Sequence, residues 1–195
     1  MIITPESSSE QPGLRVRKAT REDVPQIARL VLASLDTSLP GFKFSSLPEN
    51  ELSAVEARQR VRLPPAAQSL CLVDIASGGI LGYSVVRSPG PDHPEHKKGE
   101  HPELDMFFVK AGMSGRGFGS MLMQTVKERW KDSGLCLRVF TRNMRAIKFY
   151  QGRGFAIESE EEDHWVGEGV HKQKEPMYLM RWSPTTSESS TSHPQ

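Results

Sequence analysis

The segment from Glu103 to Phe140, ELDMFFVKAGMSGRGFGSMLMQTVKERWKDSGLCLRVF, decides the fold. Its first eight residues are apolar on both faces after an acidic start, which is typical of an inner strand. The next apolar run has helical spacing and ends just before Gly134; its stripe is formed by Phe118, Met121, Leu122, Val126 and Trp130. A second strand over 135–140 completes a strand, helix, strand unit, and the right-handed crossover makes the two strands parallel.

The glycine-rich stretch SGRGFGS, Ser114–Ser120, lies where the first strand turns into the helix. A helix N-terminus presents unpaired N–H groups and partial positive charge, and glycines let a phosphate oxygen reach them. The stretch therefore predicts a phosphate-binding loop. The alternative is a tight turn that needs positive φ, for which one or two glycines would be enough.

Two familiar phosphate motifs are not met by this loop. A dinucleotide loop ends in a third glycine and has an acidic residue about 20 positions on, but Ser120 replaces that glycine and Thr141-Arg142 follow the next strand. No glycine is followed by Lys and then Ser or Thr, as a P-loop requires. A different phosphate-bearing cofactor is favoured, and a nicotinamide enzyme is only a distant alternative.

The rest of the chain alternates strand and helix patterns. A strand over 14–19 leads through Thr20, an N-cap with Asp23 three residues on, into a helix over 21–35. A second helix is predicted over 48–62, then a hairpin of SLCLVDI and ILGYSVVR, and late strands GFAIESE and PMYLMRW. These elements predict an α/β (α+β) fold: a mixed sheet of about six or seven strands, antiparallel in its first half, with a central parallel pair and helices on both faces.

Composition predicts one domain with loose ends. The 195 residues are 36% hydrophobic, and Lys+Arg 25 against Asp+Glu 24 leaves no overall field for nucleic acid or an anionic membrane. Residues 1–13 and 183–195 are low-complexity and predicted to be disordered tails around a domain over 14–182. No run approaches the roughly 20 apolar residues of a membrane span, and the two cysteines lie in strand patterns, so we expect a cytoplasmic protein.

Two motifs in order, FFVKAGMSGRGFGSML and LRVFTRNMRAIKFYQGRGF, resemble the cofactor-binding half of the GNAT family of N-acetyltransferases. The resemblance is strongest from Glu103 to Phe155. It implies the three-layer fold of that family and transfer of an acetyl group from acetyl-CoA, as co-substrate, to an amine. Gly117 and Gly119 match the family loop, but Ser114 stands where the family has arginine or glutamine.

The resemblance also implies the coenzyme contacts. The pyrophosphate would meet the loop amides and the charge of Arg116, over Ser114, Gly115, Arg116, Gly117, Phe118, Gly119 and Ser120. The pantetheine arm would hydrogen-bond the backbone of Phe108 and Val109. On the following helix, which Asn143 begins, Asn143 would contact the cofactor, with Ala146 and Tyr150 one turn apart on the same face.

Two residues are predicted to be catalytic. Tyr150 matches the family tyrosine that protonates the departing thiolate, and a phenol is protonated at neutral pH; the alternative is a core tyrosine beside Phe149. Glu103 sits where relatives place a strand base for the acceptor amine, and Asp105 projects on the same face. A covalent route through Cys136 is disfavoured because strand cysteines are usually buried, so direct transfer in a ternary complex is expected.

The acceptor is predicted only as a small-molecule or peptide amine. The acidic run Glu158–Trp165 is either a solvated loop, which is favoured, or an attraction for a cationic amine. Arg138 stands where relatives that modify protein N-termini often have an acidic residue, which disfavours that branch. The missing family residue at Ser114 motivates a different alternative, a non-catalytic acyl-CoA sensor, and the resemblance allows a homodimer.

Three histidines, His93, His96 and His101, fall in a polar stretch over 88–102. Solvated loop histidines are favoured over a metal site, because no carboxylate or cysteine spacing supports ligation. No metal is expected.

Overall fold

The computed structural model describes residues 13–38, 41–63, 68–88, 101–166 and 173–184. These residues contain a seven-stranded sheet of order β1-β2-β3-β4-β5-β7-β6. The strands are β1 (Leu14–Lys18), β2 (Gln68–Asp74), β3 (Ile80–Arg87), β4 (Glu103–Val109), β5 (Leu135–Phe140), β6 (Ala156–Val166) and β7 (Gln173–Trp182). Only β4 and β5 are parallel, so the predicted mixed sheet with one central parallel pair is confirmed.

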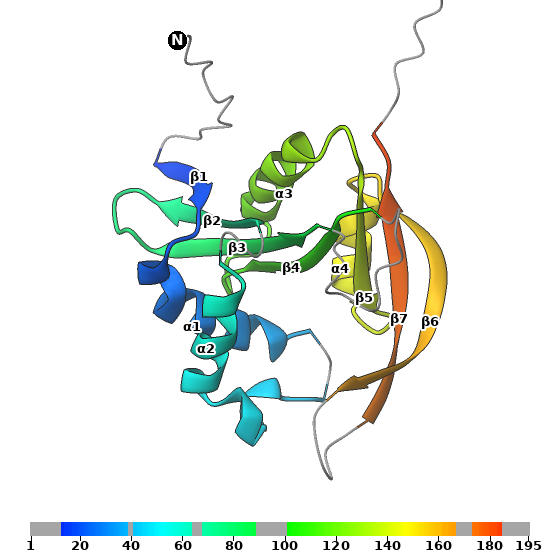
Figure 1. Ribbon diagram of the computed structural model, residues 1–195, viewed down its shortest axis with the longest axis horizontal. Helices are drawn as coiled ribbons and strands as arrows, with labels where there is room; N and C mark the ends of the chain where they lie inside the picture. Colours follow the sequence, from blue (N-terminus) through cyan, green and yellow to red (C-terminus); the bar gives the residue numbers. More distant parts are fainter. Residues whose placement is uncertain (1–12, 39–40, 64–67, 89–100, 167–172, 185–195) are drawn as a thin grey trace, which may run out of the picture.

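Helices cover both faces of this sheet, as predicted. They are α1 (Val24–Leu35), α2 (Leu52–Val61), α3 (Phe118–Arg129) and α4 (Met144–Gln151). Figure 1 shows α1 and α2 together on one side of β2–β4 and α3 on the other, with α4 beside β5. Ile27 and Val31 of α1 pack with the β2–β3 hairpin, while α3 and α4 share a second core with β5 and β7.

Helix α1 is fixed to β1 by a half-buried ion pair. Arg17 donates two hydrogen bonds to Asp23, at 2.6 and 2.7 Å, and the backbone N–H of Thr20 donates to the same carboxylate. The side chain of Asp23 is buried, and its pKa is lowered: burial alone would raise it, but the bonds from Arg17 and Thr20 outweigh that effect. The predicted Thr20–Asp23 helix start is thereby observed.

The run Glu158–Trp165 is not the solvated loop that its charge favoured. It belongs to β6, which pairs antiparallel with β7 along its length. Backbone pairing with β7 supplies the hydrogen bonds, and β6 is an edge strand in the sheet order, where charged side chains can face water.

Strands β4 and β5 diverge almost as soon as they meet. Their register holds a single pair, Glu103 with Cys136, although the strands have seven and six residues. Figure 1 shows β5 leaving β4 at a steep angle. Most side chains of β4 are therefore only half-buried, unlike those of the inner strand that the apolar pattern predicted.

Some predictions lie outside the described residues. They include His93, His96 and the tails, except for Gly13, Ser183 and Pro184. Within the described segments no group of three or more His, Cys, Asp or Glu side chains is arranged to hold a metal ion. None of the helices in those segments is long and apolar enough to cross a membrane.

Gly119 lies where α3 approaches α4 most tightly. A Cβ built on this residue would be 2.9 Å from Cε2 of Phe149, closer than carbon atoms normally approach. The aromatic ring of Phe149 also packs against Phe107 of β4, at 5.5 Å between centroids. Any side chain at position 119 would therefore push α4 away from β4.

We predict that Gly119→Ala lowers the free energy of unfolding by about 1–2 kcal/mol, because the steric cost exceeds the gain in helix propensity. Urea denaturation measures the change. Gln124→Ala, exposed on the same helix, is the control and should be close to neutral. Most of the penalty should vanish in a Phe149→Leu background; an equal penalty there would show that the ring is not its cause.

Candidate functional site

The glycine loop forms the N-terminus of α3, as the sequence predicted. Gly117 is the N-cap residue of α3, and no side chain makes a capping hydrogen bond to this end of the helix. The first helical hydrogen bond runs from Met121 N to Gly117 O at 3.0 Å, so the amides of Phe118, Gly119 and Ser120 precede the helix ladder. This end of α3 can bind an anion.

Each glycine of the loop also has a conformational reason. Gly115 and Gly117 have φ of 81° and 84°, a region that other residues rarely adopt, and Gly119 is required by its contact with Phe149. The tight-turn alternative therefore accounts for two glycines and packing for the third. Phosphate contact with the loop stays a prediction. Ser114 and Arg116 are both exposed.

Beyond their single pair, β4 and β5 share no further register, and we call this separation of the two strands, which ends where β4 leads into the glycine loop, the opening. Phe108 and Val109, the predicted pantetheine contacts, pair with β3 on the other side of β4. The carbonyl of Val109 already accepts a hydrogen bond from Ser34 Oγ of α1, at 3.3 Å. The carbonyl of Val109 therefore already has a partner in α1. We assign a ligand contact at the end of β4 to backbone N–H groups instead.

Helix α4 begins with Asn143, whose Oδ1 accepts a hydrogen bond from Ala146 N at 3.1 Å. The side-chain N–H group of Asn143 is not used by this capping bond and is available for the predicted cofactor contact. Ala146 is half-buried on the same helix face as Tyr150.

Tyr150 is 8% exposed and lies in the core under the opening. Its ring makes edge contacts with Phe107, Phe149 and Phe155, at 6.3, 5.4 and 5.7 Å between centroids. Burial raises the pKa of its phenol well above the ordinary value of about 10. The packing that the core alternative expected is thus present, and the same packing keeps the phenol protonated at neutral pH; its role as an acid stays a prediction.

Glu103 lies at the apex of the divergence. Its Oε1 accepts a hydrogen bond from Arg138 Nη1 of β5 at 2.9 Å, and Arg138 Nε donates to Glu161 of β6 at 2.7 Å. The three charges thus bridge β4, β5 and β6. Burial alone would lower the pKa of the Arg138 guanidinium, but Glu161 and Glu103 together raise it above its usual range.

Asp105 is the residue that the β3–β4 register skips, a bulge next to the apex. Its carboxylate contacts the guanidinium groups of Arg87 at 2.9 Å and Arg62 at 3.3 Å. Sequence reasoning placed Glu103 and Asp105 on one face but missed all three arginine partners, which come from 18 to 43 residues away in the chain.

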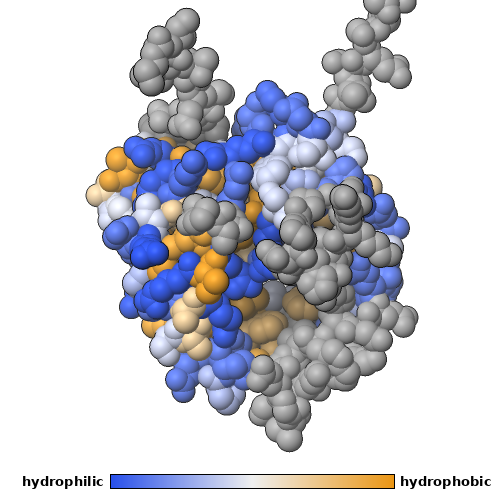
Figure 2. Space-filling model, in the orientation of Figure 1, coloured by the Kyte–Doolittle hydropathy of each residue, from blue (hydrophilic) through white to orange (hydrophobic). Residues whose placement is uncertain are grey.

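A hollow opens on this side of the sheet between α1 and β5, with hydrophobic residues at its floor (Figure 2). Phe44 is buried here against Leu35, Phe42 and Phe140, and the rings of Phe42 and Phe44 are 4.8 Å apart. The sequence analysis did not single out this aromatic cluster. Its only signal was two phenylalanines two positions apart, beside a predicted loop.

Both cysteines are buried and not in a disulfide. Burial raises the pKa of the Cys71 thiol to about 12. The Sγ atom of Cys136 donates to the carbonyl of His101 at 3.5 Å. The environment of Cys71 does not activate a thiolate, and the burial of both cysteines agrees with the expectation that they fill the core.

The fold is shared with known acetyltransferases. Solved structures with this fold include the ribosomal-protein-S18-alanine N-acetyltransferase from Escherichia coli, with a TM-score of 0.62 and 14% identity over 90% of this chain and 97% of that one. Another is the PaiA N-acetyltransferase from Thermoplasma acidophilum, solved with coenzyme A, with a TM-score of 0.59 and 14% identity over 87% of this chain and 98% of that one.

Sequence comparison gives the same family. The spermine/spermidine N(1)-acetyltransferase of Bacillus subtilis (strain 168) is 28% identical over 119 residues, which cover 57% of this chain and 77% of that protein. The model of the Acetyltransferase (GNAT) family matches residues 37–155, more than half of the chain. Because this match includes the divergent strands, the glycine loop and α4, the chain belongs to the GNAT family and is an N-acetyltransferase.

Proposed function

We propose that this chain binds acetyl-CoA in the opening between β4 and β5 and transfers the acetyl group directly to an amine, with Glu103 as base and Tyr150 as acid. The observation that carries the proposal is the single register pair of β4 and β5, which leaves backbone groups of β4 without a strand partner next to a helix N-terminus. Buried backbone groups need partners, and a ligand with an extended amide arm and phosphates fits them.

Acetyl-CoA supplies an activated acetyl thioester when it is bound. The amides of Phe118, Gly119 and Ser120 would hold its pyrophosphate, and backbone groups on the β5 side of the end of β4 would hold its pantetheine arm. The side-chain N–H group of Asn143, which takes no part in the capping hydrogen bond, would contact the same arm. The arginine or glutamine that the family places at the loop is replaced by Ser114, so backbone amides would carry more of the binding here.

The carboxylate of Glu103 takes the proton that an ammonium must lose before its nitrogen can attack a carbonyl. Its ion pair with Arg138 fixes the carboxylate at the strand apex, on the face that α1 and α2 cover. The phenol of Tyr150, on the opposite face, holds a proton at Oη for the departing sulfur. The two groups therefore serve the two sides of one opening.

The acceptor in this proposal is an amine that enters from the hollow beside α1. Relatives named as spermine acetyltransferases make polyamines the first compounds to test. The described carboxylates of Glu103, Asp105 and Glu161 each contact an arginine, so they attract a polycation less than unpaired carboxylates would. Monoamines with an apolar group, which suit the aromatic cluster, belong in the same screen.

A thermal melt with acetyl-CoA, free coenzyme A and NAD tests the donor. Ligand at 100 times its dissociation constant adds roughly 2.7 kcal/mol, or about 5–10 °C for a domain of this size. We expect that rise with acetyl-CoA and coenzyme A and none with NAD. A flat response to saturating acetyl-CoA would remove the coenzyme from the proposal.

Tyr150→Phe and Glu103→Gln should each lower kcat by about 10²-fold or more while changing the affinity for coenzyme A little. Both changes keep the side-chain shape, so folding should be retained. Thiol release with an accepted amine, together with calorimetric binding of coenzyme A, makes the measurement.

Two matched variants separate chemistry from structure in that experiment. Tyr178→Phe changes a second tyrosine, which is half-buried, and Glu158→Gln changes another strand glutamate that pairs with an arginine, Arg181 at 2.8 Å. Both should keep wild-type turnover. Wild-type turnover in Tyr150→Phe or Glu103→Gln would withdraw the role assigned to that residue.

Direct transfer predicts that no thiol reacts in the native protein. Iodoacetamide at pH 8 should label neither Cys71 nor Cys136 before unfolding and both in urea, because burial suppresses thiolate formation. Mass spectrometry counts the labels. Rapid native labelling of Cys136, or an acetyl adduct on it after incubation with acetyl-CoA, would favour a covalent route instead.

A further inference from the structure

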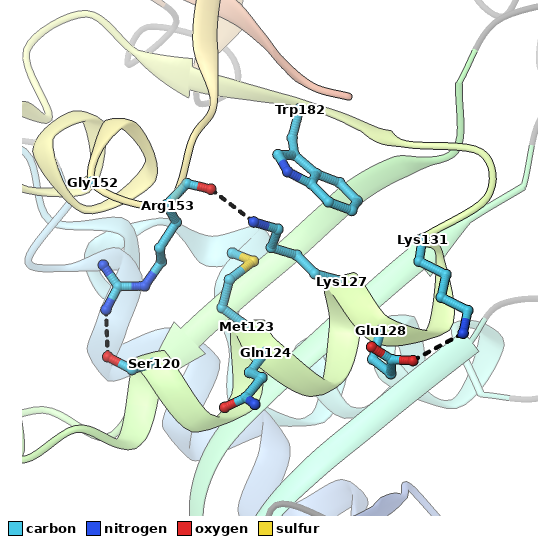
Figure 3. A pocket seen from close by; sticks show the side chains of 9 residues that line it. All are labelled: Ser120, Met123, Gln124, Lys127, Glu128, Lys131, Gly152, Arg153 and Trp182. Carbon is cyan, nitrogen blue, oxygen red and sulfur yellow. Dashed lines mark hydrogen bonds and ion pairs between the residues drawn. The ribbon is translucent and has the colours of Figure 1, made fainter. Parts of the chain in front are cut away.

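A groove of about 490 Å³ lies outside the opening between β4 and β5, along the outer side of α3. Figure 3 shows its lining, from the start of α3 to the end of β7: Ser120, Met123, Gln124, Lys127, Glu128, Lys131, Gly152, Arg153 and Trp182. Volumes of this size are typical of sites for small ligands. Of the residues that line the groove, only Ser120 has been given a role above.

Two cations of the groove are held without a counter-ion. Lys127 Nζ donates to the carbonyl of Arg153 at 3.0 Å and lies 4.3 Å from the centre of the Trp182 ring. Arg153 stacks 3.6 Å from the Phe149 ring and donates to Ser120 Oγ. Across the described segments, no carboxylate lies within 4.0 Å of either cation.

The remaining carboxylate of the groove is already used. Glu128 pairs with Lys131 at 3.1 Å. The pKa of the Lys127 ammonium is lowered, mainly by burial and further by the charge of Arg153, and burial lowers the pKa of Arg153 as well. The positive charges of Lys127 and Arg153 repel each other. A bound anion would offset this repulsion and would replace part of the hydration that the two cations have lost.

The groove is continuous with the glycine loop. Ser120 belongs to both, and Gln124 and Lys127 follow it at helical spacings of four and three residues, on one face of α3, with Lys131 in the turn just after the helix. Seven residues of helix place Lys127 about 10 Å along the axis from Ser120. A second anionic group one sugar away from a pyrophosphate at the loop would therefore meet these cations.

We propose that Lys127 and Arg153 bind the 3′-phosphate of coenzyme A, a phosphate monoester on the adenosine ribose, in this groove. The inference rests on the proposed function for its coenzyme. Ser114 supplies no positive charge at the glycine loop. In this proposal Lys127 and Arg153 supply positive charge from the groove along α3, and that charge meets the 3′-phosphate instead of the pyrophosphate.

Titration calorimetry with coenzyme A and 3′-dephospho-coenzyme A, which differ only in that phosphate, tests the proposal at 150 mM salt. We expect the wild-type chain to bind coenzyme A about 10-fold more tightly, a difference of about 1.4 kcal/mol. Lys127→Gln should reduce the ratio to below about 3-fold by weakening coenzyme A alone, since a charge-assisted bond is lost. Arg129→Gln removes an exposed cation of the same helix outside the groove and should keep the wild-type ratio.

The other outcomes overturn the proposal in distinguishable ways. Equal affinity of the wild-type chain for the two compounds would exclude recognition of the 3′-phosphate while leaving coenzyme binding intact. An unchanged ratio in Lys127→Gln, or an equal loss for both compounds, would place the phosphate elsewhere or give Lys127 a structural role. Binding of neither compound to the wild-type chain would overturn the proposed function together with this inference.

Discussion

The single register pair between β4 and β5 is the constraint on which the rest of this molecule depends. Parallel strands normally share a regular ladder of hydrogen bonds, and each buried backbone group left without one raises the free energy of the fold. Here the strands separate just after Glu103 and Cys136, so the sheet exchanges part of its ladder for an opening. The glycine loop and α3 follow directly from the end of β4, which places a helix N-terminus at the mouth of that opening.

Packing on both faces compensates for the missing ladder. On one side α1 is tied to β1 through Arg17 and Asp23 and to the end of β4 through Ser34. On the other side the rings of Phe107, Phe149 and Tyr150 contact one another across β4 and α4. Arg138 then bridges the apex itself by binding carboxylates from β4 and β6. Two cores and one ion-pair cluster therefore hold apart strands that backbone pairing alone would bring together.

The sequence predicted those features that depend on local spacing. The apolar run from Glu103, the stripe of α3 and the start of α4 at Asn143 each have a period or a capping residue that local physics determines, and each is confirmed. The ion pair of Glu103 with Arg138 joins residues 35 positions apart, which no periodicity reveals. The late strand GFAIESE is confirmed as the first half of β6, but the solvated loop favoured for the acidic run Glu158–Trp165 was wrong for a related reason. Acidic residues have low strand propensity, and only the partner strand β7 makes the conformation favourable.

The site of Lys127 and Arg153 could not be predicted from the sequence for the same reason. What sets these two cations apart is that no described carboxylate forms an ion pair with either of them, and this is visible only in the folded chain. At the apex every described carboxylate has a guanidinium partner, whereas these two cations are partly buried beside each other and bonded only to neutral oxygens. The two ends of the site thus differ in charge: the acceptor side is compensated and the α3 side is positive. A coenzyme that carries its phosphates at one end and its reactive group at the other matches this difference, with the phosphates along α3 and the thioester at Glu103. In the proposed arrangement, this difference in charge would orient the donor before any contact at the reacting atoms is made.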